Sequence, residues 1–162
     1  MKIIIHPNQI LRQKATEVAG FDHELKDLVE EMKNTLTAAK GLGLAAPQVA
    51  TLQRIFIIDK NLGQDQKTEK KEYHIFINPR ISWKSSDKTF EYEGCLSIPG
   101  LEGKIWRSTK IRVNAYNSQG KKFSLQAKNL LARAIQHEYD HLEGILYIDY
   151  INNKKDLRKV EI

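Results

Sequence analysis

Apolar and polar residues alternate along the chain in patterns that predict two helices separated by a run of strands. Residues 22–40 carry apolar side chains at helical spacing, with Asp22 as a suitable N-cap and Gly41 as a stop. Residues 128–142 repeat the helical pattern, and Gly144 follows as a terminator. The apolar stripe of the first segment is Leu25, Leu28, Val29, Met32 and Leu36. Such a stripe is most simply a face buried in the core.

Between the two helical segments, β-branched and aromatic runs indicate strands. Strands are predicted at residues 54–59, 73–77, 81–83, 89–92, 110–116, 121–126 and 145–150. The turn residues 117–120 join two of these as a hairpin, and the polar segment 61–72 is expected to be another hairpin loop. This order predicts an α+β fold, in which antiparallel or mixed sheets pack around the central C-terminal helix, with an additional N-terminal helix.

Composition narrows the class of protein. The 162 residues, 41% of them hydrophobic, indicate one domain spanning residues 1–162. No apolar run approaches the roughly 18–20 residues of a membrane span, and no secretory signal is visible, so no membrane partner is expected. The lone Cys95 excludes an internal disulfide and fits a reducing compartment. The net charge of +6 permits nucleic-acid binding, but the lysines are scattered along the sequence and no basic stripe interleaved with aromatics stands out.

The sharpest local signal is the pentad His137-Glu138-Tyr139-Asp140-His141 in the second helical segment. Four helical residues turn through about 400°, so the two imidazoles share a face and can chelate one metal ion. Glu138 can reach a metal-bound water without being a ligand. A solvent-exposed polar patch is the alternative. However, the pentad lies between the apolar residues Ile135 and Leu142 in an otherwise apolar helix, and burying its polar side chains there is costly unless they have a function.

A catalytic metal needs a third protein ligand and an open position. No histidine follows His141, and Glu143 is too close in sequence and is expected to point elsewhere on the helix. Cys95, within the segment 93–97, is the better candidate because a thiolate binds borderline and soft divalent ions strongly. A lone cysteine is by itself more simply a small buried hydrophobe, and its pairing with the two-histidine helix reverses that balance.

The segment 41–48, with the sequence Gly-Leu-Gly-Leu-Ala-Ala-Pro-Gln, allows close approach of the backbone to another group. Its glycine spacing does not suit a phosphate cradle, and no Lys-Ser/Thr pair follows. Gln48 carries an amide donor that could serve a developing oxyanion. A tight turn without a binding role is the alternative.

Together, and in this order, the segments 41–48, 93–97 and 136–142 make the sequence resemble the peptide deformylase family. The resemblance spans nearly the whole chain and is weakest in the 60–72 loop and after Tyr150. It implies a metal-dependent hydrolase that removes the formyl group from the N-terminal formyl-methionine of newly made peptides. It also implies a bacterial-type cytoplasmic enzyme, with an organellar location left open, and one divalent ion, natively Fe(II) with Zn, Ni or Co as substitutes, held by Cys95, His137 and His141.

The resemblance also implies roles for the residues around the metal. Glu138 is the general base and later the acid, while the Gln48 amide and the Leu96 N–H hold the oxyanion. Glu93 and Arg107 form a structural ion pair that supports the cysteine loop. The residues expected to bind the substrate are Leu42, Gly43, Ile98, Gly100, Arg133 and Ala134.

Three other functions are alternatives to this one. A peptidase would use the same two-histidine helix, but the upstream cysteine and the lack of a downstream ligand argue against it. A non-catalytic relative would bind metal or peptide only, and the intact Gln48, Glu138 and ligand set argue against that. A basic RNA-binding protein would bind RNA in a salt-dependent way that survives mutation of His137. The expected partners are formyl-methionyl nascent peptides and, transiently, the ribosome, with no specific DNA, and the chain is expected to be a monomer.

Overall fold

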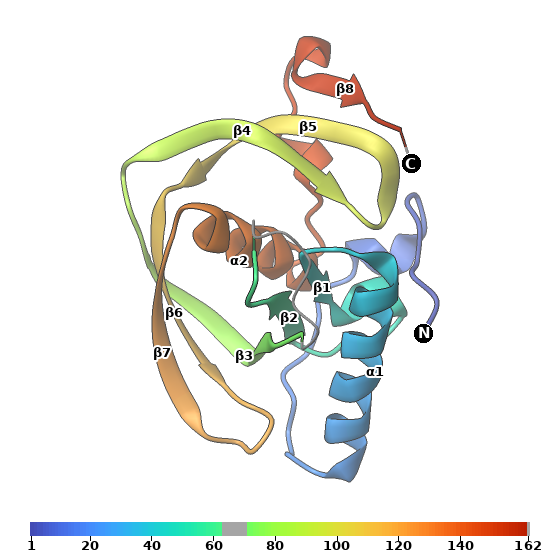
Figure 1. Ribbon diagram of the computed structural model, residues 1–162, viewed down its shortest axis with the longest axis vertical. Coiled ribbons are helices and arrows are strands. Elements are labelled where there is room, and N and C mark those ends of the chain that lie inside the picture. The colour runs from blue at the N-terminus through green and yellow to red at the C-terminus, as the bar shows by residue number, and fades with distance from the viewer. Residues whose placement is uncertain (63–70, 162) are drawn as a thin grey trace.

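The computed structural model describes residues 1–62 and 71–161, which form two antiparallel sheets around one helix (Figure 1). A five-stranded sheet has the order β1-β2-β3-β6-β7, and a three-stranded sheet has the order β4-β5-β8. The strands are β1 Gly43–Ala45, β2 Ile55–Asp59, β3 Tyr73–Lys84, β4 Lys88–Cys95, β5 Ile98–Ser108, β6 Lys110–Tyr116, β7 Lys122–Lys128 and β8 Leu157–Lys159. With helices α1 (His23–Ala39) and α2 (Asn129–Leu142), this confirms the α+β prediction.

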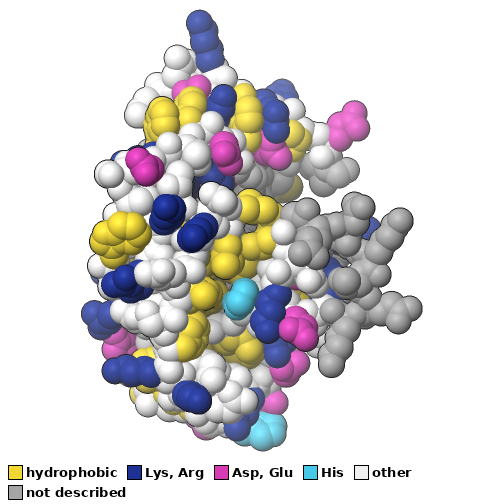
Figure 2. All heavy atoms as spheres, turned by 60° about the vertical axis from the view of Figure 1, so that its left-hand side comes forward, with side chains coloured by type: hydrophobic (Ala, Val, Ile, Leu, Met, Phe, Trp, Pro, Cys, Tyr) yellow, Lys and Arg dark blue, Asp and Glu magenta, His cyan; other side chains and the backbone are white. Residues whose placement is uncertain are grey.

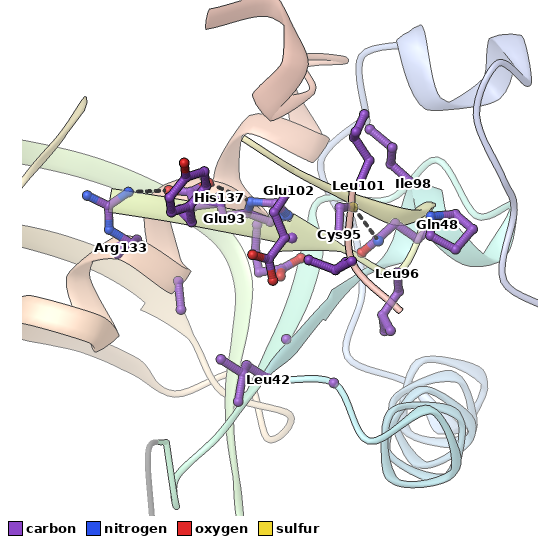
Figure 3. A pocket seen from close by; sticks show the side chains of 18 of the residues that line it. Leu42, Gln48, Glu93, Cys95, Leu96, Ile98, Leu101, Glu102, Arg133 and His137 are labelled. Carbon is purple, nitrogen blue, oxygen red and sulfur yellow. Dashed lines mark hydrogen bonds and ion pairs between the residues drawn. The ribbon is translucent and has the colours of Figure 1, made fainter. Parts of the chain in front are cut away.

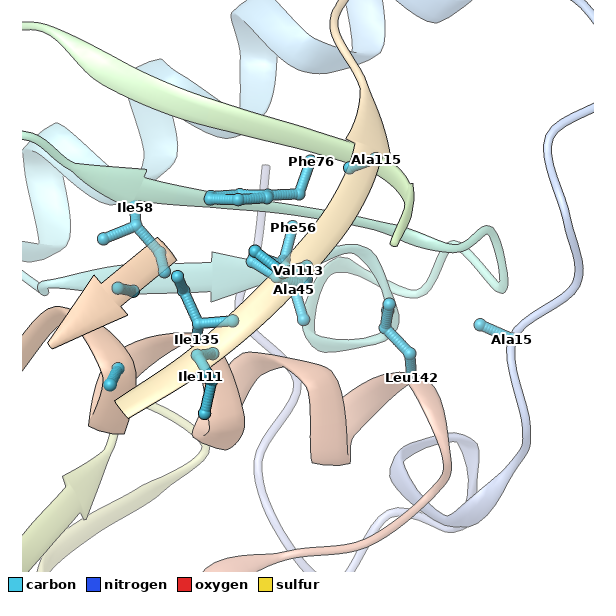
Figure 4. Close-up of a cluster of buried hydrophobic side chains, with 12 residues drawn as sticks. Ala15, Ala45, Phe56, Ile58, Phe76, Ile111, Val113, Ala115, Ile135 and Leu142 are labelled. Carbon is cyan, nitrogen blue, oxygen red and sulfur yellow. The ribbon is translucent and has the colours of Figure 1, made fainter. Parts of the chain in front are cut away.

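Helix α2 lies between the two sheets (Figure 1). Its apolar side meets the five-stranded sheet in a buried cluster, where Ile135 packs with Phe56, Phe76 and Val113 (Figure 4). The rings of Phe56 and Phe76 stack with their centroids 4.7 Å apart. Burying such side chains contributes about 1.5–3 kcal/mol each, so the helix that carries the two histidines is held in place by the main core.

Helix α1 follows the sequence pattern closely. The Asp22 carboxylate accepts a hydrogen bond from the Leu25 N–H at 3.0 Å, so Asp22 is the N-cap. The helix ends at Ala39, and its C-cap Lys40 takes the left-handed conformation at φ 54°, one residue before the predicted stop at Gly41. Its apolar stripe, including Met32 and Leu36, packs against the five-stranded sheet. Among the described residues, neither helix has both the length and the apolar character required to cross a bilayer.

Several strand predictions need correction. Residues 145–150, predicted as a strand, instead contain the 3-10 helix Tyr147–Tyr150, because the Asp149 carboxylate accepts the Leu146 N–H at 2.9 Å and closes a turn. Residues 73–77 and 81–83 belong to one strand, β3, whose pairing with β6 is irregular. β5 was missed because one proline and two glycines, which are depleted in strands, lie in its first half. The predicted hairpin loop at 61–72 falls mostly on residues 63–70, outside the described residues.

Candidate active site

A pocket of about 430 Å³ opens between α2, the β4–β5 turn and the segment that leads into β1 (Figure 3). All six residues expected to bind the substrate line it, as do Gln48, Glu93, Cys95, Leu96, His137 and Glu138. The lining also includes Tyr92, Leu101, Glu102 and Val160, which sequence reasoning did not single out. Leu101 and Glu102 reach the pocket through the unpredicted strand β5, so no local pattern could have identified them.

The predicted metal ligands lie together at this pocket. The donor atoms of Cys95, His137 and His141 all lie within 4.8 Å of one another. Sγ of Cys95 is 3.3 Å from Nε2 of His141, and the two imidazole centroids are 5.1 Å apart. A tetrahedral ion with bonds of about 2.0–2.3 Å holds its ligand atoms roughly 3.3–3.8 Å apart. The three donors therefore fit one ion after only a small contraction.

The Cys95 thiol reaches this position because the strand that carries it ends irregularly. β4 and β5 pair in regular register up to Gly94 opposite Glu102, and the register then shifts so that Cys95 faces Ile98. A bulge of this kind redirects the side chain that follows it. The shift places the Cys95 side chain next to the helix that carries the two histidines, although His137 lies 42 positions further along the chain.

Glu93 orients one of the histidines. Its Oε2 lies 2.9 Å from Nδ1 of His137, which leaves Nε2 as the free nitrogen of that ring. Arg107 donates two hydrogen bonds to the same carboxylate, at 2.8 and 3.0 Å, and Arg133 donates a third at 2.8 Å. Burial alone would raise the pKa of Glu93, but the hydrogen bonds and charges of His137 and Arg107 hold it well below its usual range. Glu93 is therefore an anion next to the three converging donors.

The other acidic residues near the pentad serve as anchors. The carboxylate of Asp140 accepts hydrogen bonds from Arg107 at 2.6 Å and from the Tyr150 hydroxyl at 3.0 Å, which ties α2 to β5 and to the 3-10 helix after it. Glu143, which was not expected to be a ligand, forms an ion pair with Arg54 at 2.6 Å and another with Lys14 at 3.0 Å. Neither carboxylate belongs to the group of three converging donors.

Glu138 is the least paired acidic group of the site. Its side chain is buried, and its Oε2 has no hydrogen-bond partner among the described residues. Burial raises the pKa of Glu138 to about 7. An unpartnered buried carboxylate costs about 1–3 kcal/mol or more, and carboxylates kept in this condition cluster at sites of proton transfer. Its free oxygen is available to accept a hydrogen bond from a water molecule beside the three converging donors.

Gln48 is fixed by hydrogen bonds beside Cys95, one of the predicted metal ligands. Its Oε1 accepts the Ala45 N–H at 2.8 Å, while its Nε2 donates to Ser97 Oγ at 3.1 Å and lies 3.5 Å from Sγ of Cys95 (Figure 3). The oxygen contact decides which end of the amide faces the site. Gln48 therefore presents N–H donors, and not its carbonyl, toward the reacting position.

Arg133, one of the residues expected to bind the substrate, lines the pocket but is almost fully buried. Only 5% of the residue is exposed, and its guanidinium donates to Glu93 and to the carbonyls of Ile105 and Thr89. Its charge is thus engaged by the Glu93 network. A substrate-binding role for Arg133 stays a prediction.

Comparisons with known proteins point in one direction. The profile of the polypeptide deformylase family matches residues 1–157. Peptide deformylase 1 of Clostridium perfringens is 46% identical to the chain over 143 residues, which cover 88% of this chain and 92% of that protein. The crystal structure of a peptide deformylase from Synechococcus elongatus in complex with actinonin has a TM-score of 0.89 at 36% identity, covering 96% of this chain and 83% of the other. For peptide deformylase from Plasmodium falciparum the TM-score is 0.87 at 39% identity, covering 96% and 88%.

Proposed function

Because the chain belongs to the peptide deformylase family, as its three motifs predicted, we propose that it removes the N-terminal formyl group from formyl-methionine of newly made peptides. The observation that carries this proposal is the convergence of Cys95, His137 and His141 beside the buried, unpaired Glu138. Residues 1–162 would act as one catalytic domain. We further propose that the chain is a monomer, that it acts in the cytoplasm, and that it associates transiently with the ribosome, where it meets its substrates.

The three ligands would hold one divalent ion, which lowers the pKa of a bound water and polarises the formyl carbonyl. Fe(II) is the proposed native ion, and Zn, Ni or Co would be accepted because a thiolate with two imidazoles suits several metals. Glu93 holds His137 in the tautomer that leaves Nε2 free for the metal.

The chain's own residues would then handle the proton and the charge. Glu138 accepts the proton of the attacking water and returns it to the leaving amine, and a pKa of about 7 suits both roles. The amide of Gln48 and the N–H of Leu96 donate to the oxygen on which negative charge develops. Removing one such donor typically lowers the rate by about a hundredfold or more.

The pocket walls support selection for the formyl group and for methionine. Formyl is the smallest acyl group, and Leu42, Gly43 and Leu96 would crowd the reacting position so that an added methyl is excluded. Ile98 and Ala134 would contact the methionine side chain. The peptide backbone would extend between Gly43 and Gly100, as a strand added to a sheet edge.

Anaerobic purification with metal analysis, followed by assays on three peptides, tests this proposal. Formyl-Met-Ala-Ser should release formate with about one metal ion per chain, whereas acetyl-Met-Ala-Ser should be inert. Cleavage of an internal peptide bond in a blocked peptide would identify a peptidase instead. Metal binding without hydrolysis of any of the three would identify a binding protein and overturn the proposal.

A further inference from the structure

Positive charge is concentrated in one segment of the sequence, and the proposed reaction assigns no role to most of these charges. Between Glu102 and Glu138 the chain contains no aspartate or glutamate, yet it contains eight lysines and arginines. The net charge of the whole chain is only +6. Arg107 and Arg133 belong to the Glu93 network. The remaining six therefore provide an excess of positive charge on other parts of this segment.

Strand pairing gathers four of these cations on one surface. Along β6, buried Ile111, Val113 and Ala115 alternate with exposed residues, so Lys110 and Arg112 point away from the core. In β7, Lys128 lies directly opposite Lys110, and Lys122 lies opposite Tyr116. We call the four exposed cations the basic face: Lys110, Arg112, Lys122 and Lys128.

The basic face is not neutralised by the rest of the molecule. Within residues 1–62 and 71–161, none of its four cations forms an ion pair with a carboxylate. Lys110 and Lys128 lie directly opposite each other on neighbouring strands. Like charges in such a pair destabilise the sheet. Figure 2, in which the side of the molecule with β6 and β7 comes forward, shows several dark blue Lys and Arg side chains spread over this face. The arrangement is therefore suited to a polyanionic partner.

An exposed tryptophan is placed on the same surface by a strand irregularity. Ile81 pairs with Val113 on the core side, and the register then shifts so that Trp83 pairs with Arg112. Without the shift, Trp83 would stand opposite the buried Ile111, because side chains alternate between faces. Instead, 50% of Trp83 is exposed next to a cation of the basic face. An indole held out in this way offers a flat surface for stacking.

A second aromatic platform lies on the adjoining strands. Trp106 of β5 is 61% exposed and stacks on Phe90 of β4, with ring centroids 4.9 Å apart. The ammonium of Lys104 lies 5.1 Å from the Phe90 centroid. Trp106 and the partly exposed Lys104 lie on the side of β5 opposite to buried Ile105, as Lys110 and Arg112 lie on the side of β6 opposite to buried Ile111. Exposed aromatic rings and cations are thus present on the outer sides of both strands.

We propose that this outer surface binds single-stranded RNA, with the basic face contacting phosphates and with Trp83 and Trp106 stacking on unpaired bases. An anionic bilayer fits less well because the neighbours of the cations, Asn114, Ser124 and Gln126, are polar, whereas interfacial binding requires a continuous apolar face. No residue of β6 or β7 lines the pocket. RNA binding would therefore be independent of the proposed hydrolysis.

The test measures binding of a fluorescein-labelled single-stranded RNA of about 20 nucleotides to the full chain, by fluorescence anisotropy over a salt series. The variant Lys110→Glu/Arg112→Glu/Lys128→Glu should bind at least about tenfold more weakly, and its salt slope should fall by about 2, since each phosphate contact to a single strand contributes about 0.7. The matched control is Lys26→Glu/Lys154→Glu/Lys155→Glu, which makes the same charge change at exposed positions outside β3, β6 and β7. The control should stay within about threefold of the unmodified chain.

The indoles are tested separately. Trp83→Ala should weaken RNA binding by about fivefold or more, whereas Trp83→Phe should retain most of it because a ring remains for stacking. Release of formate from formyl-Met-Ala-Ser should be unchanged in all of these variants, which also shows that they are folded. Equal loss in the two triple variants, no effect of Trp83→Ala, or tighter binding to vesicles with one-third phosphatidylglycerol than to RNA would each overturn the proposal.

Discussion

The carboxylate of Glu138 lies directly against Gly43, where a Cβ atom would come within 2.5 Å of Oε1. Gly43 opens β1 and Glu138 lies in the second half of α2, so the strand and the helix are in close contact at these two residues. The φ angle of Gly43 is not positive. The need for glycine here is therefore steric, because an added methyl group would overlap with the side chain of Glu138, the proposed general base.

Replacing Gly43 by alanine should displace the Glu138 carboxylate. We expect kcat for formyl-Met-Ala-Ser to fall at least about tenfold while metal content is unchanged, because misplacement of a reacting group by about 1 Å lowers the rate strongly. The control is Gly20→Ala, where the nearest atom to an added Cβ lies 3.9 Å away. A Gly43→Ala protein with normal kcat would contradict the steric argument.

Glu138→Gln should separate proton transfer from metal binding. The substitution keeps the shape of the side chain, so the chain should fold and bind about as much metal as before. Loss of the base should lower kcat by about 10²–10⁴-fold. Metal analysis, circular dichroism and formate release on the same preparation check this prediction, and substantial turnover in the metal-loaded variant would remove Glu138 from its assigned role.

Glu93→Gln should damage both stability and metal binding. The neutral amide would leave Arg107 and Arg133 buried with less compensation, and breaking a buried ion pair costs about 3–5 kcal/mol. Loss of the contact to His137 should weaken metal affinity by about 10–100-fold. Glu17→Gln, which removes the exposed partner of Arg80, should cost under about 1 kcal/mol. Urea unfolding and metal titration measure the two effects.

Acid should weaken the contact between the N-terminal segment and the end of the chain. Burial tends to raise the pKa of Asp149, but hydrogen bonds from Arg12 and the Leu146 N–H lower it overall. A carboxylate with a lowered pKa stabilises the fold above its unfolded pKa of about 3.9, and this contribution is lost as pH falls through the folded pKa. Both side chains are over one-third exposed, so the effect is at most about 1 kcal/mol. The stability difference between the unmodified chain and Asp149→Asn should therefore be present at pH 7 and shrink below about pH 4, as denaturant midpoints will show.

Features that depend on neighbours in sequence could be predicted from the sequence alone. The cap at Asp22, the apolar stripe of α1 and the shared face of His137 and His141 follow from helical periodicity, which acts over one or two turns. The three motifs sufficed to identify the family, because each places chemically distinctive residues at a fixed local spacing. Of the residues that contact the Glu93 carboxylate, only Arg107 was predicted as its partner, and that prediction came from the family resemblance.

The tertiary structure decided everything that depends on which strands pair. β5 lacks a strand-like pattern in its first half and forms because β4 and β8 pair with it, which brings Glu102 and Leu101 to the pocket. Arg133 faces Glu93 because α2 packs under β4, and nothing near Arg133 in the sequence indicates that partner. Lysines that are scattered along the chain become one surface when Lys110 meets Lys128 across a ladder. Pairing register is set by burial of the opposite face of the whole sheet, so it is a property of the assembled core and not of any local segment.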